Sequence, residues 1–191
     1  MDVAPFLIVG LGNPGPAYQN TRHNIGAIQL KYLGDYFRMA KWRSRFSGLY
    51  TDARRGKHSL ALLFPQTFMN LSGESVKQAV EKLGIPVSQI LVFHDEVDLP
   101  LGTVKVKIGG GTSGHRGLIS LVEHLESPDF IRIRMGIGRP CGDMINHVLG
   151  CFEPLEDQKI PQILEKSTAI TEAILNNGPT YAMNAFNGNR Q

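Results

Sequence analysis

The chain has 191 residues, of which 42% are hydrophobic and 19% are charged. This composition is typical of one globular domain and excludes disordered and fibrous proteins, and the length suffices for a continuous core. The formal net charge of +3 is compatible with a polyanionic partner but is too small to identify one. We therefore expect a single domain over residues 1–191.

Cysteine usage and hydropathy indicate the compartment. Cys141 and Cys151 have neither C-x-x-C spacing nor a pattern of histidine ligands, as expected for a reduced, cytoplasmic chain. No apolar run approaches the ~20 residues of a membrane-spanning helix, and Asp2 and a strand stand where a basic targeting segment would begin. We expect a cytoplasmic protein that does not contact a membrane.

Segments with a hydrophobic period of two alternate with segments of period 3.6, which predicts an α/β domain. Pro65 ends one expected strand, Gly84 closes one expected helix, and Pro161 fits the first turn of the last helix. The pattern predicts strands at 6–9, 59–64, 90–93, 103–108 and 131–137, helices at 25–37, 72–83, 118–125 and 156–175, and a basic connection at 38–55 that fits a pair of strands.

Residues 10–15, GLGNPG, have the letters of the dinucleotide fingerprint G-x-G-x-x-G directly after the first strand. That fingerprint requires a loop that opens into a helix with its N-terminal amides facing a pyrophosphate. Pro14 and Pro16 interrupt the chain where this helix would run, so we interpret the segment as a loop that carries polar side chains. A nicotinamide-linked oxidoreductase, with Asp35 as the ribose ligand, stays as an alternative.

Two expected strands carry cations at alternate positions. Lys105 and Lys107 alternate with apolar residues in one strand, and Arg132 and Arg134 do so in the other. Because successive side chains of a strand point to opposite faces, we expect all four cations on a solvent face. They are either ordinary solvated residues or a patch that faces a phosphate group.

Four polar clusters lie at the ends of expected strands or just before helices, where ligands gather in open α/β sheets. An imidazole, a carboxylate and two carboxamides at one edge of the sheet would supply a general base, its orienting partner and donors to an oxyanion. Asn70 has a second interpretation as the N-cap of the helix that follows it. The clusters are Asn13 with His23, and residues 67–70, 94–98 and 114–117.

The residues argue against two other chemistries. Residues 111–114, GTSG, lack the spacing of a G-x-S-x-G nucleophile elbow, so we do not expect covalent serine catalysis. Neighbouring acidic residues at 95–98 point to opposite faces of a strand, so we expect no metal site. An aspartate beside a histidine helps it to take a proton from water near neutral pH, which makes water the expected nucleophile.

Five separated segments resemble the bacterial-type peptidyl-tRNA hydrolases, and the resemblance runs the whole length of the chain. It implies a single domain with a twisted, mixed and mostly parallel β-sheet flanked by helices. It also implies a monomeric, cofactor-free esterase that hydrolyses the ester bond between peptide and tRNA in peptidyl-tRNA and so recycles the tRNA. The segments are FLIVGLGNPGPAYQNTRHNIG (6–26), PQTFMNLSGESV (65–76), ILVFHDEVDLPLGTVKVKIGGG (90–111), GHRGL (114–118) and FIRIRMGIGRP (130–140).

The resemblance also implies roles for individual residues. His23 matches the histidine that activates water, and Asp95 matches the carboxylate that orients it. Asn13 and Asn70 match carboxamides that position the peptide and support the reacting carbonyl. The expected substrate contacts are Tyr18, Phe68 and Met69 in the cleft, and Lys107 and Arg134 at the terminal phosphate of the tRNA, with Lys105 and Arg132 beside them.

One position departs from the family pattern. Arg116 stands where the family usually has the asparagine of its Gly-His-Asn-Gly segment. We expect Arg116 to contact the substrate and hydrolysis to persist with altered handling of the tRNA. A relative of the same fold that binds RNA without cleaving esters, similar to the plant organelle splicing factors, stays as the alternative, although the intact catalytic set argues against it.

Overall fold

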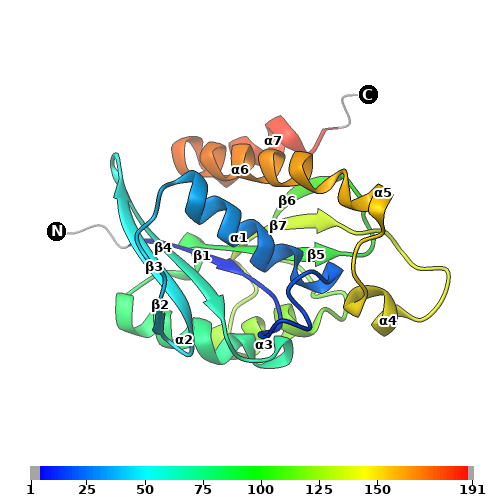
Figure 1. Cartoon of the computed structure of the whole chain (residues 1–191). Helices are drawn as coiled ribbons and strands as arrows, with labels where there is room; N and C mark the ends of the chain where they lie inside the picture. Colours follow the sequence, from blue (N-terminus) through cyan, green and yellow to red (C-terminus); the bar gives the residue numbers. More distant parts are fainter. Residues whose placement is uncertain (1–4, 189–191) are drawn as a thin grey trace.

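A computed structural model describes residues 5–188 and shows one twisted sheet between two layers of helices (Figure 1). The strand order is β2-β3-β4-β1-β5-β7-β6. The mixed sheet that we expected is confirmed, with parallel pairing at its centre and antiparallel pairing at both edges. The central strands are β4 (His58–Pro65), β1 (Phe6–Gly10), β5 (Ile90–Glu96) and β7 (Ile131–Gly136), and the antiparallel strands are β2 (Arg43–Arg45), β3 (Gly48–Arg55) and β6 (Val104–Ile108).

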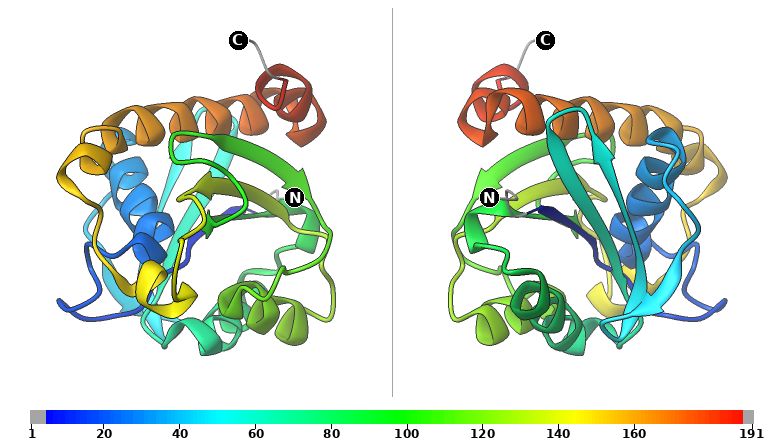
Figure 2. Two further views of the ribbon diagram at one scale, coloured as in Figure 1. Left: turned by 90° about the vertical axis from the view of Figure 1, so that its right-hand side faces the viewer. Right: turned by 90° about the vertical axis from the view of Figure 1, so that its left-hand side faces the viewer.

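Alternate residues of the central strands enter two hydrophobic cores, one on each face of the sheet. Ile8 and Phe93 belong to one core, and Val9 and Val92 belong to the other. Figure 2 shows the two helical layers from both ends. The first face is covered by α1 (Ile25–Tyr36), α6 (Ile160–Asn177) and α7 (Pro179–Phe186), the second by α2 (Ser72–Leu83) and α3 (Arg116–Leu125), and the short helices α4 (Met144–Leu149) and α5 (Pro154–Asp157) lie at one end of the sheet.

The C-terminal region differs most from the sequence-based expectation. The single helix predicted at 156–175 is two helices, because α5 ends at Asp157 and α6 begins at Ile160 with Pro161 in its first turn, as expected. The turn after Asn177 ends α6, but Pro179 then occupies the first turn of α7, which the pattern did not predict. The six-residue helix α4 is also new, since six residues are too few to show a helical period.

The interpretation of the first loop is confirmed. No helix opens at Gly15; the chain continues as a loop, forms a 3-10 turn at Arg22–Asn24, and begins α1 only at Ile25. The nicotinamide alternative therefore lacks the helix N-terminus that its pyrophosphate would need. Among the described residues, no helix combines the length and apolar character that crossing a membrane requires.

Two glycines let α1 lie directly against the sheet. A Cβ atom on Gly26 would lie 2.3 Å from the carbonyl oxygen of Phe93, and a Cβ atom on Gly10 would lie 2.5 Å from the carbonyl oxygen of Gly26. Any larger side chain would push the helix away from β1 and β5. This close approach holds the N-terminus of α1, and the 3-10 turn before it, at the carboxyl ends of both strands.

Candidate active site

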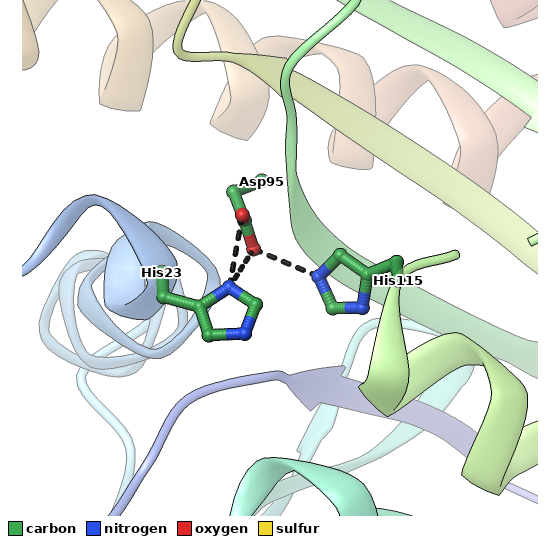
Figure 3. Close-up of side chains that lie close together, drawn as sticks. All are labelled: His23, Asp95 and His115. Carbon is green, nitrogen blue, oxygen red and sulfur yellow. Dashed lines mark hydrogen bonds and ion pairs between the residues drawn. The ribbon is translucent and has the colours of Figure 1, made fainter. Parts of the chain in front are cut away.

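Three side chains from distant parts of the chain meet at the carboxyl edge of the sheet (Figure 3). Asp95 comes from the end of β5, His23 from the 3-10 turn before α1, and His115 from the residue before α3. Nδ1 of His23 lies 2.9 Å from each carboxylate oxygen of Asp95, and Nε2 of His115 lies 2.8 Å from Oδ1 of the same carboxylate. The expected pair of His23 and Asp95 is thus part of a group of three.

The start of α3 fixes the protonation of His115. The backbone amides of Gly117 and Leu118 donate to Nδ1 of His115 over 3.1 and 3.3 Å, so His115 is the N-cap of the helix. An Nδ1 that accepts hydrogen bonds carries no proton, and the proton of the neutral ring must therefore lie on Nε2. His115 consequently donates to Asp95, and neither of its ring nitrogens remains free to accept a proton.

Asp95 remains an anion although it is only 3% exposed. Burial alone would raise the pKa of its carboxyl group, but the charge interactions with His115 and His23 and the hydrogen bonds from both rings hold that pKa well below its usual range. An ionised Asp95 accepts a hydrogen bond from the Nδ1–H group of His23. In the neutral ring Nε2 is then the nitrogen without a proton, and Figure 3 shows Nε2 directed away from Asp95.

The three side chains could also be considered as metal ligands, because one ligand atom of each lies within 4.8 Å of the others. A metal bound at Nε2 of His115 would require the ring proton to move to Nδ1. That proton would break both hydrogen bonds from the start of α3. The donor set therefore fits a hydrogen-bonded pair of histidines better than a metal centre.

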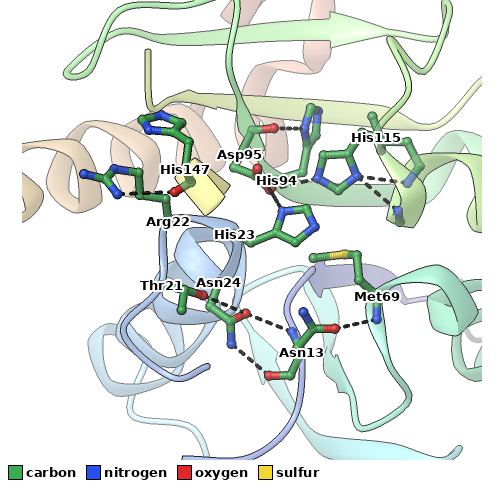
Figure 4. Close-up of polar contacts among 12 residues, drawn as sticks. Asn13, Thr21, Arg22, His23, Asn24, Met69, His94, Asp95, His115 and His147 are labelled. Atoms are coloured by element: carbon green, nitrogen blue, oxygen red, sulfur yellow. Dashed lines mark hydrogen bonds and ion pairs between the residues drawn. The ribbon is translucent and has the colours of Figure 1, made fainter. Parts of the chain in front are cut away.

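Hydrogen bonds hold both the backbone and the side chain of Asn13 (Figure 4). The side chain of Asn24 accepts from the Asn13 amide over 2.9 Å and donates to its carbonyl oxygen over 2.8 Å. The amide of Met69 donates to Oδ1 of Asn13 over 2.8 Å, which fixes the orientation of the carboxamide. Nδ2 of Asn13 makes no hydrogen bond within the described residues and remains a donor for a ligand.

His94, the residue before Asp95 in β5, is buried. Its Nδ1 donates to the backbone carbonyl oxygen of Asp95 over 2.8 Å, and its ring packs edge-on against His115 with centroids 5.2 Å apart. Burial is the main cause that lowers the pKa of His94, to about 3. His94 is therefore neutral at physiological pH and acts as a packing residue.

A cavity of about 200 Å³ lies over this group and is closed on one side by α4. His23, Asp95, His115 and Arg116 line it together with Met144 and Ile145 of the helix. Both apolar side chains of α4 are exposed, 40% for Met144 and 58% for Ile145. The cavity thus has a charged floor and one apolar wall.

Arg22 joins this apolar wall to the turn that carries His23. Its Nη1 donates to the carbonyl oxygen of His147 in α4 over 3.2 Å, and its Nη2 lies 2.5 Å from the carboxylate of Glu156 in α5. The guanidinium also lies 5.5 Å from the centre of the Phe152 ring. No local pattern in the sequence predicts this link, because its partners are more than a hundred residues away from Arg22.

The remaining residues expected in the cleft occupy different environments. Met69 is buried, Tyr18 is half-buried and Phe68 is 55% exposed, beside the carboxyl edge of β4. Asn70 is exposed within a 3-10 turn, Met69–Leu71. The interpretation of Asn70 as a helix cap is wrong, because Leu71 is the N-cap residue of α2 and no side chain caps that helix.

The expectation that four cations share a solvent face is wrong for Arg132. Its side chain is 2% exposed and donates to the carbonyl oxygens of Gly111 and Gly110 over 2.7 and 2.8 Å. The loop after β6 folds over this face of β7, which strand alternation alone does not reveal. Lys105 and Lys107 are half-buried, and Arg134 is half-buried with Nε 3.1 Å from the carboxylate of Glu96.

Comparison with known proteins identifies the family of this chain. The family model described as peptidyl-tRNA hydrolase matches residues 7–191. The chain is 48% identical to a peptidyl-tRNA hydrolase of Pelobacter propionicus, with 95% of this chain and 94% of that protein covered. It is 40% identical to a peptidyl-tRNA hydrolase of Clostridium tetani, with 97% and 98% covered.

A solved structure shows the same fold. The crystal structure of peptidyl-tRNA hydrolase from Acinetobacter baumannii superposes with a TM-score of 0.90 at 34% sequence identity. The alignment covers 97% of this chain and 95% of that one. Sequence and structure therefore agree over nearly the whole length, and the chain belongs to the peptidyl-tRNA hydrolase family.

Proposed function

We propose that this chain hydrolyses the ester bond between peptide and tRNA in peptidyl-tRNA, with water as the nucleophile and His23 as the general base. The observation that carries the proposal is the hydrogen bond from Nδ1 of His23 to an ionised Asp95. This bond leaves Nε2 unprotonated toward the cavity, which is the state that a general base requires. The family supplies the substrate class.

The reaction proceeds in two proton transfers at Nε2 of His23. Nε2 takes a proton from water as the water oxygen attacks the ester carbonyl carbon, and the negative charge moves to the carbonyl oxygen. Asp95 stabilises the imidazolium that forms. The tetrahedral intermediate then collapses, the bond to the ribose oxygen breaks, and the proton on Nε2 passes to that oxygen, which yields a free peptide and a free tRNA.

Two carboxamides position the substrate in this scheme. The Nδ2 group of Asn13 is a donor because its Oδ1 is already used by the Met69 amide. We assign this group to the substrate carbonyl, where a fixed donor stabilises a developing oxyanion. Asn70 is exposed on the neighbouring turn and is assigned to the peptide backbone, with Tyr18, Phe68 and Met69 forming the adjacent cleft surface.

We assign the tRNA end to Lys105, Lys107 and Arg134 on β6 and β7. Lys107 and Arg132 are paired in the register of these strands, as are Lys105 and Arg134. The buried Arg132 acts indirectly, by holding the carbonyl groups of Gly110 and Gly111 in the adjoining loop. Phosphate contacts of this kind give affinity without reading sequence, which suits a substrate class with many different tRNAs.

Arg116 is assigned to the substrate as a charged contact. It is exposed at the first residue of α3 and lines the same cavity as His23. Replacement by asparagine would remove the charge while keeping a hydrogen-bonding group. We also propose that the chain acts as one domain, as a monomer, and in the cytoplasm, where peptidyl-tRNA is produced.

The proposal is tested by the release of tRNA from a purified N-acylated aminoacyl-tRNA. We expect the native protein to hydrolyse this ester and His23→Ala to lose a factor of roughly 10² to 10⁴ in kcat, because general base catalysis contributes that much. The variant must be purified identically and keep the native circular dichroism spectrum. Binding of the substrate by the native protein without turnover would favour the RNA-binding alternative.

A further inference from the structure

One edge of the sheet carries more positive charge than the whole chain. Residues 38–57, here called the basic hairpin edge, contain seven lysines and arginines and a single acidic residue, Asp52, so their formal charge is +6. Because the chain as a whole is at +3, the remaining residues are at −3. The seven cations are Arg38, Lys41, Arg43, Arg45, Arg54, Arg55 and Lys57.

The proposed function does not use this charge. The basic hairpin edge contains β2 and β3, and the cations assigned to the tRNA end lie on β6 and β7 at the opposite edge of the sheet. Six strand spacings of ~4.8 Å separate β2 from β6, which is roughly 29 Å. One phosphate group therefore cannot contact both edges.

Arginines and aromatic rings alternate at the end of the basic hairpin edge that is closer to the catalytic group. The guanidinium of Arg45 lies 4.4 Å from the centre of the Phe46 ring and 5.3 Å from that of Tyr50. Arg43 lies 4.9 Å from the Tyr50 ring and pairs with Asp52. A guanidinium that stacks on a ring keeps the N–H groups at its rim available for phosphate oxygens.

Arg45 is half-buried and, unlike Arg43, has no acidic partner in the described part of the chain. Within residues 5–188 no carboxylate lies within ion-pair distance of it, and it donates no hydrogen bond. It lines two surface hollows, of about 460 Å³ and 480 Å³. Gln66 and Thr67, directly before Phe68, line the first hollow, and Phe46, Glu81 and Lys82 line the second.

A strained turn fixes this arrangement. Phe46 and Ser47 form the two-residue turn between β2 and β3, with φ values of 56° and 51°. Residues other than glycine and asparagine rarely adopt this left-handed conformation, so the turn is strained. The hydroxyl of Ser75 donates to the Phe46 carbonyl over 2.6 Å, and the amide of Gln66 donates to the Ser47 carbonyl over 2.9 Å. The surrounding structure thus holds Arg45 and Phe46 in place.

We propose that the basic hairpin edge binds the phosphate backbone of a second RNA molecule, separate from the acceptor end of the bound substrate. The inference rests on the proposed function, which places that acceptor end at Lys107 and Arg134 and the peptide beside Phe68. A concentrated positive charge that includes five arginines matches the phosphate backbone of RNA, because a planar guanidinium pairs with phosphate oxygens through two N–H groups. Tyr50 is 2% exposed and Phe46 is half-buried beneath Arg45, so these rings orient the arginines and do not stack on bases.

The test measures the fluorescence anisotropy of a labelled RNA hairpin that lacks a single-stranded 3′ end. We expect the double variant Arg43→Gln/Arg45→Gln to bind this hairpin at least about fivefold more weakly at low salt, and the slope of log affinity against log salt to fall by roughly 1.5–2, because two phosphate contacts are lost. The matched control is Lys159→Gln/Lys166→Gln, at the start and in the middle of α6, which removes the same charge and should bind normally. Arg43→Lys/Arg45→Lys keeps the charge and should retain most of the salt slope.

A competition experiment identifies the surface. An unlabelled N-acylated aminoacyl-adenosine, which has the ester of the substrate but no phosphate backbone, should leave the labelled hairpin bound to the native protein. Displacement by this compound would place the hairpin at the substrate cleft and overturn the proposal. Unchanged binding by the Gln variant would also overturn it, and aggregation of that variant with unchanged binding would show that these cations instead protect an edge strand from pairing.

Ester hydrolysis is measured on the same preparations, so that the two proposals are judged separately. The Gln variant should hydrolyse a short N-acylated aminoacyl-tRNA at the native rate while it loses binding of the hairpin. If the native protein binds the hairpin but hydrolyses no ester, the proposed function fails and the RNA surface stands. If it hydrolyses the ester but does not bind the hairpin, the RNA surface fails and the proposed function stands.

Discussion

At the residue scale, the site depends on one buried carboxylate that serves two histidines. Asp95 accepts from His23 and from His115, and each ring has a different task. His115 is tied to the amides of α3 and brings a neutral donor, whereas His23 has one nitrogen left for chemistry. Without His115, the buried carboxylate of Asp95 would accept one hydrogen bond fewer, and its negative charge would be less stabilised.

Replacement of His115 by alanine tests this dependence. We expect the pKa of Asp95 to rise toward its usual range, so that kcat falls and its acid limb moves to higher pH, while KM changes little. The variant also loses the N-cap of α3, at about 1 kcal/mol of stability. The measurement is the pH profile of kcat.

The control for this prediction is His124→Ala. His124 lies on the same helix, and its Nδ1 lies 2.8 Å from the carbonyl oxygen of Ser120, away from Asp95. His124→Ala should change the free energy of unfolding but leave the pH profile of kcat unchanged. An unchanged profile in His115→Ala would show that His115 only caps the helix.

At the element scale, the contact between α1 and the sheet determines where His23 lies. The helix approaches β1 and β5 closely at Gly26 and Gly10, and the 3-10 turn at its start carries His23 to the end of β5. Arg22, the first residue of this turn, donates hydrogen bonds to α4 and α5. The position of His23 and its tautomer are therefore set by different contacts.

Gly26→Ala should damage both folding and catalysis. The new methyl group would lie 2.3 Å from the carbonyl oxygen of Phe93, which belongs to a buried strand and cannot move freely. We expect a loss of about 1–3 kcal/mol in the free energy of unfolding, together with a lower kcat as His23 moves from Asp95. Urea denaturation and steady-state kinetics measure the two effects.

Gly34→Ala on the same helix is the comparison for this prediction. Its methyl group would meet the ring of Trp42 at 2.9 Å, and this half-buried side chain has room to turn. It should cost less stability and leave kcat unchanged. Equal losses in the two variants would mean that the approach to Phe93 is not responsible, because a change from glycine to alanine by itself favours a helix.

At the scale of the whole molecule, buried ionisable groups make the stability depend on pH. The pKa of His94 is lowered to about 3 in the folded protein from about 6.5 when unfolded, so the unfolded chain binds more protons between these values. Stability therefore falls as the pH drops below about 6.5. Asp95 acts in the same direction at lower pH. Its carboxyl group takes up a proton within the usual carboxyl range in the unfolded chain but only well below that range in the folded protein, so stability falls as the pH drops through the usual range.

Replacement of His94 by asparagine isolates the first effect. The native protein should lose up to about 1.4 kcal/mol of stability per pH unit from this group between pH 6 and 4. His94→Asn removes that contribution, so its stability should depend less on pH in this interval, even though its stability at pH 7 is lower. Urea denaturation at several pH values gives the comparison, and parallel curves for the two proteins would contradict the assignment.

Local patterns in the sequence determined most of the elements. Hydrophobic periods reflect which side of a strand or helix is buried, and they predicted the central strands and the helices α1 and α2 within a few residues. The two prolines after Gly12 predicted a loop in place of a nucleotide-binding helix, since a proline acts on its own backbone. The five motifs that resemble the family named His23 and Asp95, whose contact the structure shows.

Only the tertiary structure decided which side chains are buried, paired or free. Strand alternation placed Arg132 outside, but a loop more than twenty residues away in sequence covers it and uses its charge. The same holds for the hydrogen bond between His115 and Asp95, the contact of Met69 with Asn13, and the anchoring of α4 by Arg22. A period in the sequence reports the face of an element but not what packs against it, because those contacts join residues that only the folded chain brings together.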